Sequence, residues 1–141
     1  MSLLSEQERA LCATTAAWLD ATRALGWLGL LTGSVAGAQL LLAAEQPWIS
    51  AALLLLLLAE RYLALCLAFD AGVFRALAEG QIDEPGRFDQ SLQQLGLRSA
   101  TGRERSVESR ARGAMRLSHA RIAVVAMQVM LCAVLLARIG D

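Results

Sequence analysis

The residues in this sequence most suited to binding or reaction are an acidic and a basic side chain, Glu60 and Arg61. They are adjacent in a long apolar segment. The segment extends from Pro47 to Phe69 and includes six consecutive leucines at positions 53–58. An ionised group in the hydrocarbon of a bilayer costs at least about 2.5–3.5 kcal/mol. Such groups therefore need a partner, and they commonly hold an ion, a proton or a lipid headgroup.

Other polar side chains are expected at a similar depth on two further segments. A helix rises about 1.5 Å per residue, so Glu60 lies about 18 Å from Trp48 in a hydrocarbon core of about 30 Å. Counted from the opposite membrane face, the other apolar segments bring hydroxyl and amide groups into the same slab. We therefore predict an intramembrane polar layer formed by Glu60, Arg61, Thr32, Ser34 and Gln128.

Two interpretations of this layer are open. In the structural one, hydrogen bonds across the layer fix how three helices pack, or Glu60 pairs with Arg61 of a neighbouring subunit. The second form arises because consecutive helical residues point about 100° apart and need not satisfy each other directly. In the functional interpretation, the layer binds an ion, a proton or a lipid headgroup.

Three apolar segments have the length to cross a membrane. The chain has 141 residues, 56% of them apolar, and no net charge. The third segment is slightly short, but Arg121 and Arg138 at its ends are expected to extend to the two interfaces. The predicted fold is an all-α integral membrane protein, a single helical domain over residues 1–141 with transmembrane helices at about 24–44, 48–70 and 121–138.

Helix boundaries are marked by capping residues. Ser5 with Glu8, and Thr101 with Glu104, match the capping box that starts a helix. Gly80 is suited to end the helix that contains the leucine run. The second capping box predicts that the last helix begins before the membrane and extends into the cytoplasm.

The segment of about residues 76–118 is a polar connector on the cytoplasmic side. Asp83 and Pro85 are suited to the start of a helix, and apolar side chains follow at helical spacing. We therefore expect a short amphipathic helix at about residues 83–95.

Glycines recur every four residues in the first span, at Gly29, Gly33 and Gly37. This spacing is typical of a helix face that another helix approaches closely. The partner is either another span of the same chain or a second copy of the chain, and the sequence leaves both open.

Arginine distribution predicts the orientation. The 13 basic residues are all arginine. Eight of them lie between Arg75 and Arg116 and two more precede the first span, whereas Arg138 is alone on the opposite side. Because positive residues favour the cytoplasm, the N-terminus is expected inside and the C-terminus outside a bacterial inner membrane.

The arginine-rich first half of the last helix is either a solvated helix or a contact for anionic lipid headgroups through Arg105, Arg112 and Arg116. Nucleic acid is not expected as a partner. Glu104 and Glu108 dilute the positive charge, and no aromatic residues are interleaved.

Catalytic, metal and cofactor sites are not expected. The three cysteines, Cys12, Cys66 and Cys132, are scattered, and His119 is the one histidine. Neither zinc nor haem finds a ligand set at these spacings. The sequence contains no nucleophile motif and no nucleotide-binding glycine loop.

The expected function is that of a non-enzymatic membrane subunit. Such a subunit would sit among membrane lipids and join copies of itself, or a larger inner-membrane complex, through the face of Gly29, Gly33 and Gly37. The alternative is a small oligomeric channel or transporter in which Glu60 and Arg61 line the path of an ion or substrate.

Overall fold

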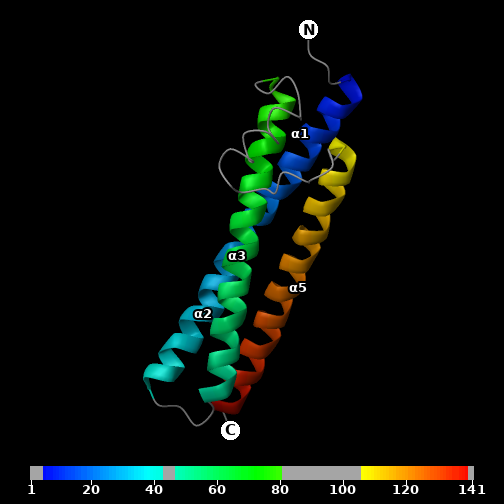
Figure 1. Ribbon diagram of the computed structural model, residues 1–141. Helices are drawn as coiled ribbons and strands as arrows, with labels where there is room; N and C mark the ends of the chain where they lie inside the picture. The colour runs from blue at the N-terminus through cyan, green and yellow to red at the C-terminus, as the bar shows by residue number, and fades with distance from the viewer. Residues whose placement is uncertain (1–4, 43–46, 81–105, 140–141) are drawn as a thin grey trace, which may run out of the picture. The chain divides into compact units, whose positions relative to one another are not determined.

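The computed structural model describes residues 5–42, 47–80 and 106–139, and this part of the chain is helical without strands (Figure 1). The all-α class is therefore confirmed. The predicted short helix at about residues 83–95, Arg105, and the Thr101–Glu104 capping box lie outside the described residues. The elements are α1 (Glu6–Ala21), the short 3-10 helix η1 (Thr22–Ala24), α2 (Leu25–Leu41), α3 (Pro47–Ala78) and α5 (Val107–Ile139).

The helix ends follow the capping chemistry of the sequence. The Glu8 backbone N–H donates to the Ser5 hydroxyl oxygen at 3.2 Å, and the Ser5 N–H donates to the Glu8 carboxylate at 2.9 Å, as a capping box requires. Gly80 follows α3 with φ of 71°, the left-handed conformation that glycine adopts without strain. Before α5, the Ser106 hydroxyl oxygen accepts a hydrogen bond from the Ser109 N–H.

Three helical stretches are long and apolar enough to span a membrane: Glu6–Leu41, Pro47–Ala78 and Val107–Arg138. They contain the predicted spans at about 48–70 and 121–138, and the predicted span at about 24–44 as far as Leu41. Membrane insertion itself is part of the functional proposal below.

The chain divides into two compact units, one of Met1–Asp20 with Ala68–Arg116 and one of Ala21–Leu67 with Leu117–Asp141. The helices α3 and α5 contribute a segment to each unit. The prediction of one domain over residues 1–141 stays a prediction.

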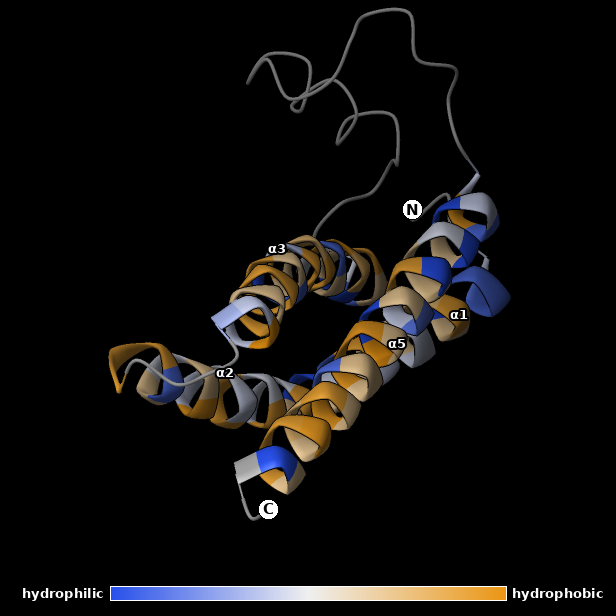
Figure 2. Cartoon of the chain, turned by 90° about the horizontal axis from the view of Figure 1, so that it is seen from below, coloured by the Kyte–Doolittle hydropathy of each residue, from blue (hydrophilic) through white to orange (hydrophobic). Residues whose placement is uncertain are grey.

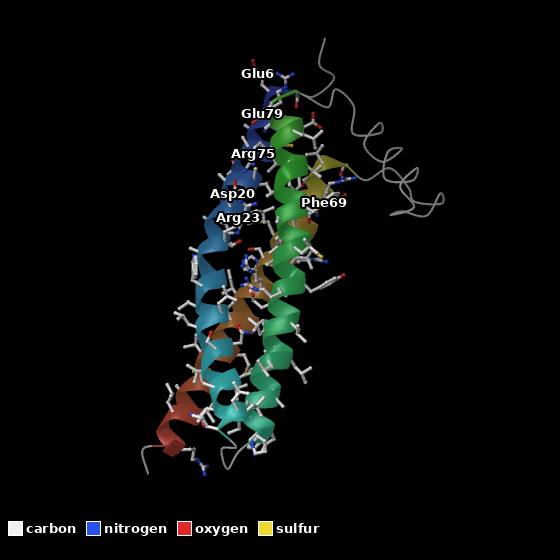
Figure 3. The ribbon with its side chains drawn as sticks, turned by 90° about the vertical axis from the view of Figure 1, so that its left-hand side faces the viewer. Glu6, Asp20, Arg23, Phe69, Arg75 and Glu79 are labelled. Carbon is white, nitrogen blue, oxygen red and sulfur yellow. The ribbon has the colours of Figure 1, made fainter. Side chains whose placement is uncertain are left out.

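In the first unit, α1 and the adjoining segments of α3 and α5 bury small and apolar side chains. Fully or nearly fully buried residues are Cys12, Leu19, Phe74, Leu77, Ala111 and Ala114. Arg75 of α3 also forms an ion pair with Asp20 of α1, and both residues are labelled in Figure 3. Because the Arg75 side chain is half exposed, this pair contributes little to stability.

In the second unit, the apolar core joins α2, α3 and α5. It consists of Ala36, Ile49, Leu53, Cys132 and Leu135. The segment of α5 that reaches this core is predominantly hydrophobic along its length (Figure 2). Much of the remaining apolar surface is exposed, including Trp27 at 72% and Leu65 at 70%.

Buried positions on α5 alternate in steps of four and three residues. They are Val107, Ala111, Ala114, Ser118, Arg121, Val125, Gln128, Cys132 and Leu135. On η1 and α2 the same alternation selects small residues: Thr22, Gly26, Gly29, Gly33 and Ala36. A mean step of about 3.5 residues keeps one face of a helix against its neighbours, as in coiled coils.

Because of this alternation, Gly29 and Gly33 lie on the packed face of α2, whereas Gly37, predicted on the same face, does not. Gly33 lies against α3, where an added Cβ would come within 2.5 Å of the Leu57 Cδ2. Gly37 has nothing within 4 Å of that position. A step of four residues rotates by about 400° on a helix, so a strict four-residue series drifts off one face, and Ala36 takes the buried position instead of Gly37.

The glycine contacts lead to a matched test. Gly33→Leu should destabilise the protein by about 1–3 kcal/mol, because the new side chain overlaps Leu57. Gly37→Leu, on the same helix, should change stability little. Thermal unfolding in detergent micelles, followed by circular dichroism, measures both.

Equal losses for the two variants would contradict this packing. A second substitution should compensate for the first. Leu57→Ala introduced into the Gly33→Leu variant should restore part of the lost stability, because it removes the side chain that the new leucine meets.

Candidate functional site

Glu60 of α3 is fully buried in the second unit, and each of its carboxylate oxygens is bound by an arginine. Arg121 of α5 donates from Nε to Oε1 at 2.8 Å, and its Nη2 lies 2.8 Å from the same oxygen. Arg61 donates from Nε to Oε2. The carboxylate thus bridges two guanidinium groups from two helices.

The two guanidinium groups also bind the start of the first span. Arg61 Nη2 donates to the backbone carbonyl oxygen of Gly26 at 2.9 Å. Arg121 Nη1 lies 3.5 Å from the Thr22 hydroxyl oxygen, the limit for a hydrogen bond. We call Glu60, Arg61, Arg121, Thr22 and the Gly26 carbonyl the polar cluster. It connects α3 and α5 to η1 and α2.

Two glycines of α2 provide the space for these charged groups. A Cβ at Gly26 would lie 2.9 Å from Arg61 Nη2 and 3.3 Å from Arg121 Nη2. A Cβ at Gly29 would lie 3.2 Å from Glu60 Oε2. The small-residue face of α2 therefore accommodates ionic side chains at Gly26 and Gly29, and an apolar one at Gly33.

Gln128 lies beside the cluster without joining it. Its side chain is fully buried, its Oε1 lies 3.5 Å from the position a Gly29 Cβ would take, and neither its oxygen nor its nitrogen has a hydrogen-bond partner. A buried amide without a partner costs about 1–3 kcal/mol. Gln128 is thus the one predicted layer residue that leaves hydrogen-bonding capacity in the interior of the described chain.

The remaining predicted layer residues bond within their own helix. Thr32 is buried and donates to the Gly29 carbonyl oxygen at 3.0 Å. Ser34 is exposed and donates to the Leu30 carbonyl oxygen at 2.8 Å. Of the five predicted residues, the structure brings Glu60 and Arg61 into direct contact, with Gln128 and Thr32 buried nearby on the facing helices.

One sequence expectation about the charges is wrong in the structure. Arg121 does not extend into solvent at an interface: it is 3% exposed and bound to Glu60. The sequence left open whether Glu60 and Arg61 pair directly; they do, because the long arginine side chain reaches sideways to the neighbouring carboxylate. The sequence did contain a signal for the burial of Arg121, because it lies seven residues before Gln128 and therefore on the same face of α5. We call this buried face the stripe of α5.

The cluster is not electrically balanced. Among the described residues of this layer, one carboxylate faces two guanidinium groups. The side chains of Glu60 and Arg121 are 0% and 4% exposed, whereas that of Arg61 is 39% exposed. The surplus positive charge is therefore accessible from outside the protein at Arg61, which we call the open edge of the cluster.

The predicted headgroup contacts on α5 are exposed and weakly paired. Arg116 is exposed, and Arg112 lies 3.4 Å from Glu108 with both side chains about 70% exposed. An exposed pair of this kind contributes little to stability. The structure leaves Arg112 and Arg116 available to solvent or to lipid.

No metal-ligand group of three His, Cys, Asp or Glu residues occurs among the described residues. The cysteines are free thiols, buried at Cys12 and Cys132 and partly buried at Cys66. In the polar cluster, the one carboxylate is already bound on both oxygens. The arrangement can therefore join helices by charge and bind an anion at Arg61, but it presents no free base or nucleophile.

Comparisons with protein-family models, with curated proteins and with solved structures found no match to this chain.

The burial of Arg121 predicts a large effect of its removal. Arg121→Leu should lower the free energy of unfolding by about 3–5 kcal/mol, because the fully buried Glu60 loses its buried partner. Arg116→Leu is the matched control on the same helix, and a change within about 0.5 kcal/mol is expected there. Thermal unfolding in micelles gives both values.

The pair can be tested further by a double-mutant cycle. Glu60→Gln combined with Arg121→Leu should cost less than the sum of the single changes, because the second change removes a charge that the first has left unpaired. Additive losses would show that the two side chains do not interact.

The unpartnered amide of Gln128, seven residues after Arg121 on the same buried face of α5, predicts the opposite result. Gln128→Leu should preserve or raise the unfolding temperature, because leucine has a similar size and leaves no polar atom without a partner. A loss comparable to that of Arg121→Leu would mean that the Gln128 amide is bonded in solution.

Proposed function

We propose that this protein is a non-enzymatic integral membrane protein, an accessory or oligomeric subunit of a bacterial inner-membrane assembly, whose polar cluster fixes the packing of three membrane-spanning helices. The observation that carries this proposal is the fully buried Glu60 carboxylate, bound on both oxygens by Arg61 and Arg121. Its contacts are saturated by the chain itself. A group held in this way serves packing better than it serves transfer of protons or ions.

The energetic argument is specific to membranes. Helices in lipid gain little from apolar contact with one another, so polar bonds between helices and close approach at small residues decide how they pack. The polar cluster supplies the first, and Gly33 against Leu57 supplies the second. A single charged pair at one depth also specifies the vertical register of α3 relative to α5.

The exposed surface supports insertion into a bilayer. Large apolar side chains are strongly exposed on α2 and α3, among them Trp27, Leu31, Leu55, Leu58 and Leu65. In water, an apolar surface of this extent would favour aggregation, whereas lipid covers it without cost. With the arginine distribution of the sequence, this supports an orientation with the N-terminus in the cytoplasm and the C-terminus outside.

Association with other subunits is better placed on other faces than the one predicted. Gly29 and Gly33 are already covered by side chains of α3 and α5. A second copy cannot approach them without displacing these helices. We therefore place contacts with copies of the chain, or with a larger complex, on the exposed apolar faces, and membrane lipids on the remainder.

A channel or transporter is the second candidate. It is favoured by the open edge of Arg61 and by the buried, unpartnered amide of Gln128, since a polar path needs both access and unsaturated polar groups. In that case Glu60 and Arg61 would line the path.

Glu60→Gln separates the two candidates. The packing role predicts a loss of about 3–5 kcal/mol in stability, because the buried Arg121 and the partly exposed Arg61 lose their carboxylate, and no ion flux in proteoliposomes of either form. Glu6→Gln, an exposed glutamate in the first turn of α1, is the control. Fluorescent flux assays and thermal unfolding, made on the same preparations, supply the two readouts.

The transport role predicts a different pattern. The wild-type protein would then carry a measurable flux of ions or protons, and Glu60→Gln would change that flux with little loss of stability. That outcome would replace the proposed function.

A further inference from the structure

The polar cluster has two positive charges and one negative charge, and an anion would neutralise the remaining positive charge. Two guanidinium groups face one carboxylate among the described residues of this layer. In or near a hydrocarbon phase an unbalanced charge is costly. This cost applies only to a chain in a membrane, so an anion at the cluster depends on the proposed function.

Arg61 is the member of the cluster that can meet such an anion. Its Nε binds Glu60 and one N–H of its Nη2 binds the Gly26 carbonyl, which leaves Nη1 without a hydrogen bond among the described residues. Its side chain is 39% exposed, whereas that of Arg121 is 4% exposed. Leu58 and Leu65, three residues before and four after Arg61, are 67% and 70% exposed. Arg61 therefore borders a surface that faces lipid.

Counted along the three predicted spans, the cluster lies in the inner half of the bilayer, between the inner boundary and a depth of about 10 Å. Gly26 and Arg121 lie near the inner ends of the first and third predicted spans, and Glu60 lies about 20 Å from the start of α3. Exposed aromatic side chains mark the same level: Trp27 directly follows Gly26, and Tyr62 directly follows Arg61. Tryptophan and tyrosine concentrate where lipid headgroups meet hydrocarbon. Trp48, 68% exposed, lies at the start of α3, where the other boundary of the second predicted span is expected.

We infer that the Arg61 edge of the polar cluster binds the phosphate of an anionic phospholipid from the cytoplasmic leaflet. A phosphodiester carries one negative charge, which balances the one surplus positive charge of the cluster. The lipid tails would lie along the exposed leucines that flank Arg61, and the free Nη1 would donate to phosphate oxygens, as guanidinium groups do in charge-assisted pairs.

Two other occupants fit this edge less well. A second copy related by a two-fold axis would bring one Arg61 towards the other, and like charges repel. An acidic residue on a partner helix would need to reach the interfacial level, where phosphate groups are already abundant. Both remain as outcomes of the experiment.

Native mass spectrometry of the full chain, released from micelles, tests the inference. Titration with phosphatidylglycerol should show one saturable lipid, bound about tenfold more tightly than phosphatidylcholine. Arg61→Gln should remove this preference, whereas Arg61→Lys should retain part of it, because it keeps the charge. Arg138→Gln, at the opposite end of the spans, is the matched control and should not change it.

Several results would overturn the inference. One is equal affinity for the two lipids in the wild type. Another is a preference that is lost in Arg116→Gln but not in Arg61→Gln. A third is a wild-type mass spectrum that shows dimers, with the dimers absent from the spectrum of Arg61→Gln. Displacement of the lipid by millimolar inorganic phosphate would show a site for free phosphate instead. Because Arg61→Gln could fail to fold, the wild type is also measured at rising ionic strength, where the preference should decrease.

This result is independent of the packing test. If Glu60→Gln destabilises the protein without any flux but no lipid preference appears, the proposed function stands and the lipid site falls. If the wild type carries flux, the proposed function falls, while the lipid measurement still reports on Arg61.

Discussion

The sharing of one carboxylate by two arginines is the interaction on which the rest of this structure depends. Glu60 has no exposed surface, so its charge is tolerable only while Arg61 and Arg121 remain in contact with it. Those contacts are possible in only one axial register of α5 relative to α3. They also require a surface on α2 without side chains, which Gly26 and Gly29 provide. Charge, glycine and helix register are therefore parts of one constraint.

Helix packing in the second unit combines two kinds of contact along the same stripe. Towards the last residues of α2 and α5 and the first residues of α3, the buried face is apolar, with Ala36, Leu53 and Leu135 in one core. Nearer the first residues of α2 the same stripe carries the ionic contacts. An apolar stripe alone tolerates sliding of one helix along another, because leucine contacts are similar at neighbouring registers. The ionic contacts remove that freedom.

Much of the fold could be predicted from the sequence, because the signals for it are local. The capping residues Ser5 and Glu8, the terminal glycine Gly80 and the long uncharged runs are each read within a few positions. The burial of Glu60 also follows locally, from the apolar residues that surround it. By contrast, its partners depend on side-chain torsions and on which faces of the helices meet, and neither is a local property.

Arg121 shows why hydropathy alone was insufficient. Hydropathy places an arginine at the end of an apolar run in the interface, whereas the alternation of three and four residues places Arg121 on the buried face with Val125 and Gln128. The two criteria conflict at this residue, and the geometric one agrees with the structure. Similarly, Gly37 matches a four-residue repeat but not the alternation, and a Cβ added there would have no neighbour within 4 Å.

The order in which the helices leave the ribosome acquires a meaning from the shared carboxylate. If the chain inserts into a membrane as we propose, α3 would enter it with both Glu60 and Arg61, whose opposite charges would offset each other and lower the barrier to insertion. Arg121 is synthesised 60 residues after Arg61 and brings a charge that has no place in lipid until it meets Glu60. On that proposal, α2 and α3 could stay in the membrane before α5 is made, and α5 would complete the contacts of the shared carboxylate through Arg121.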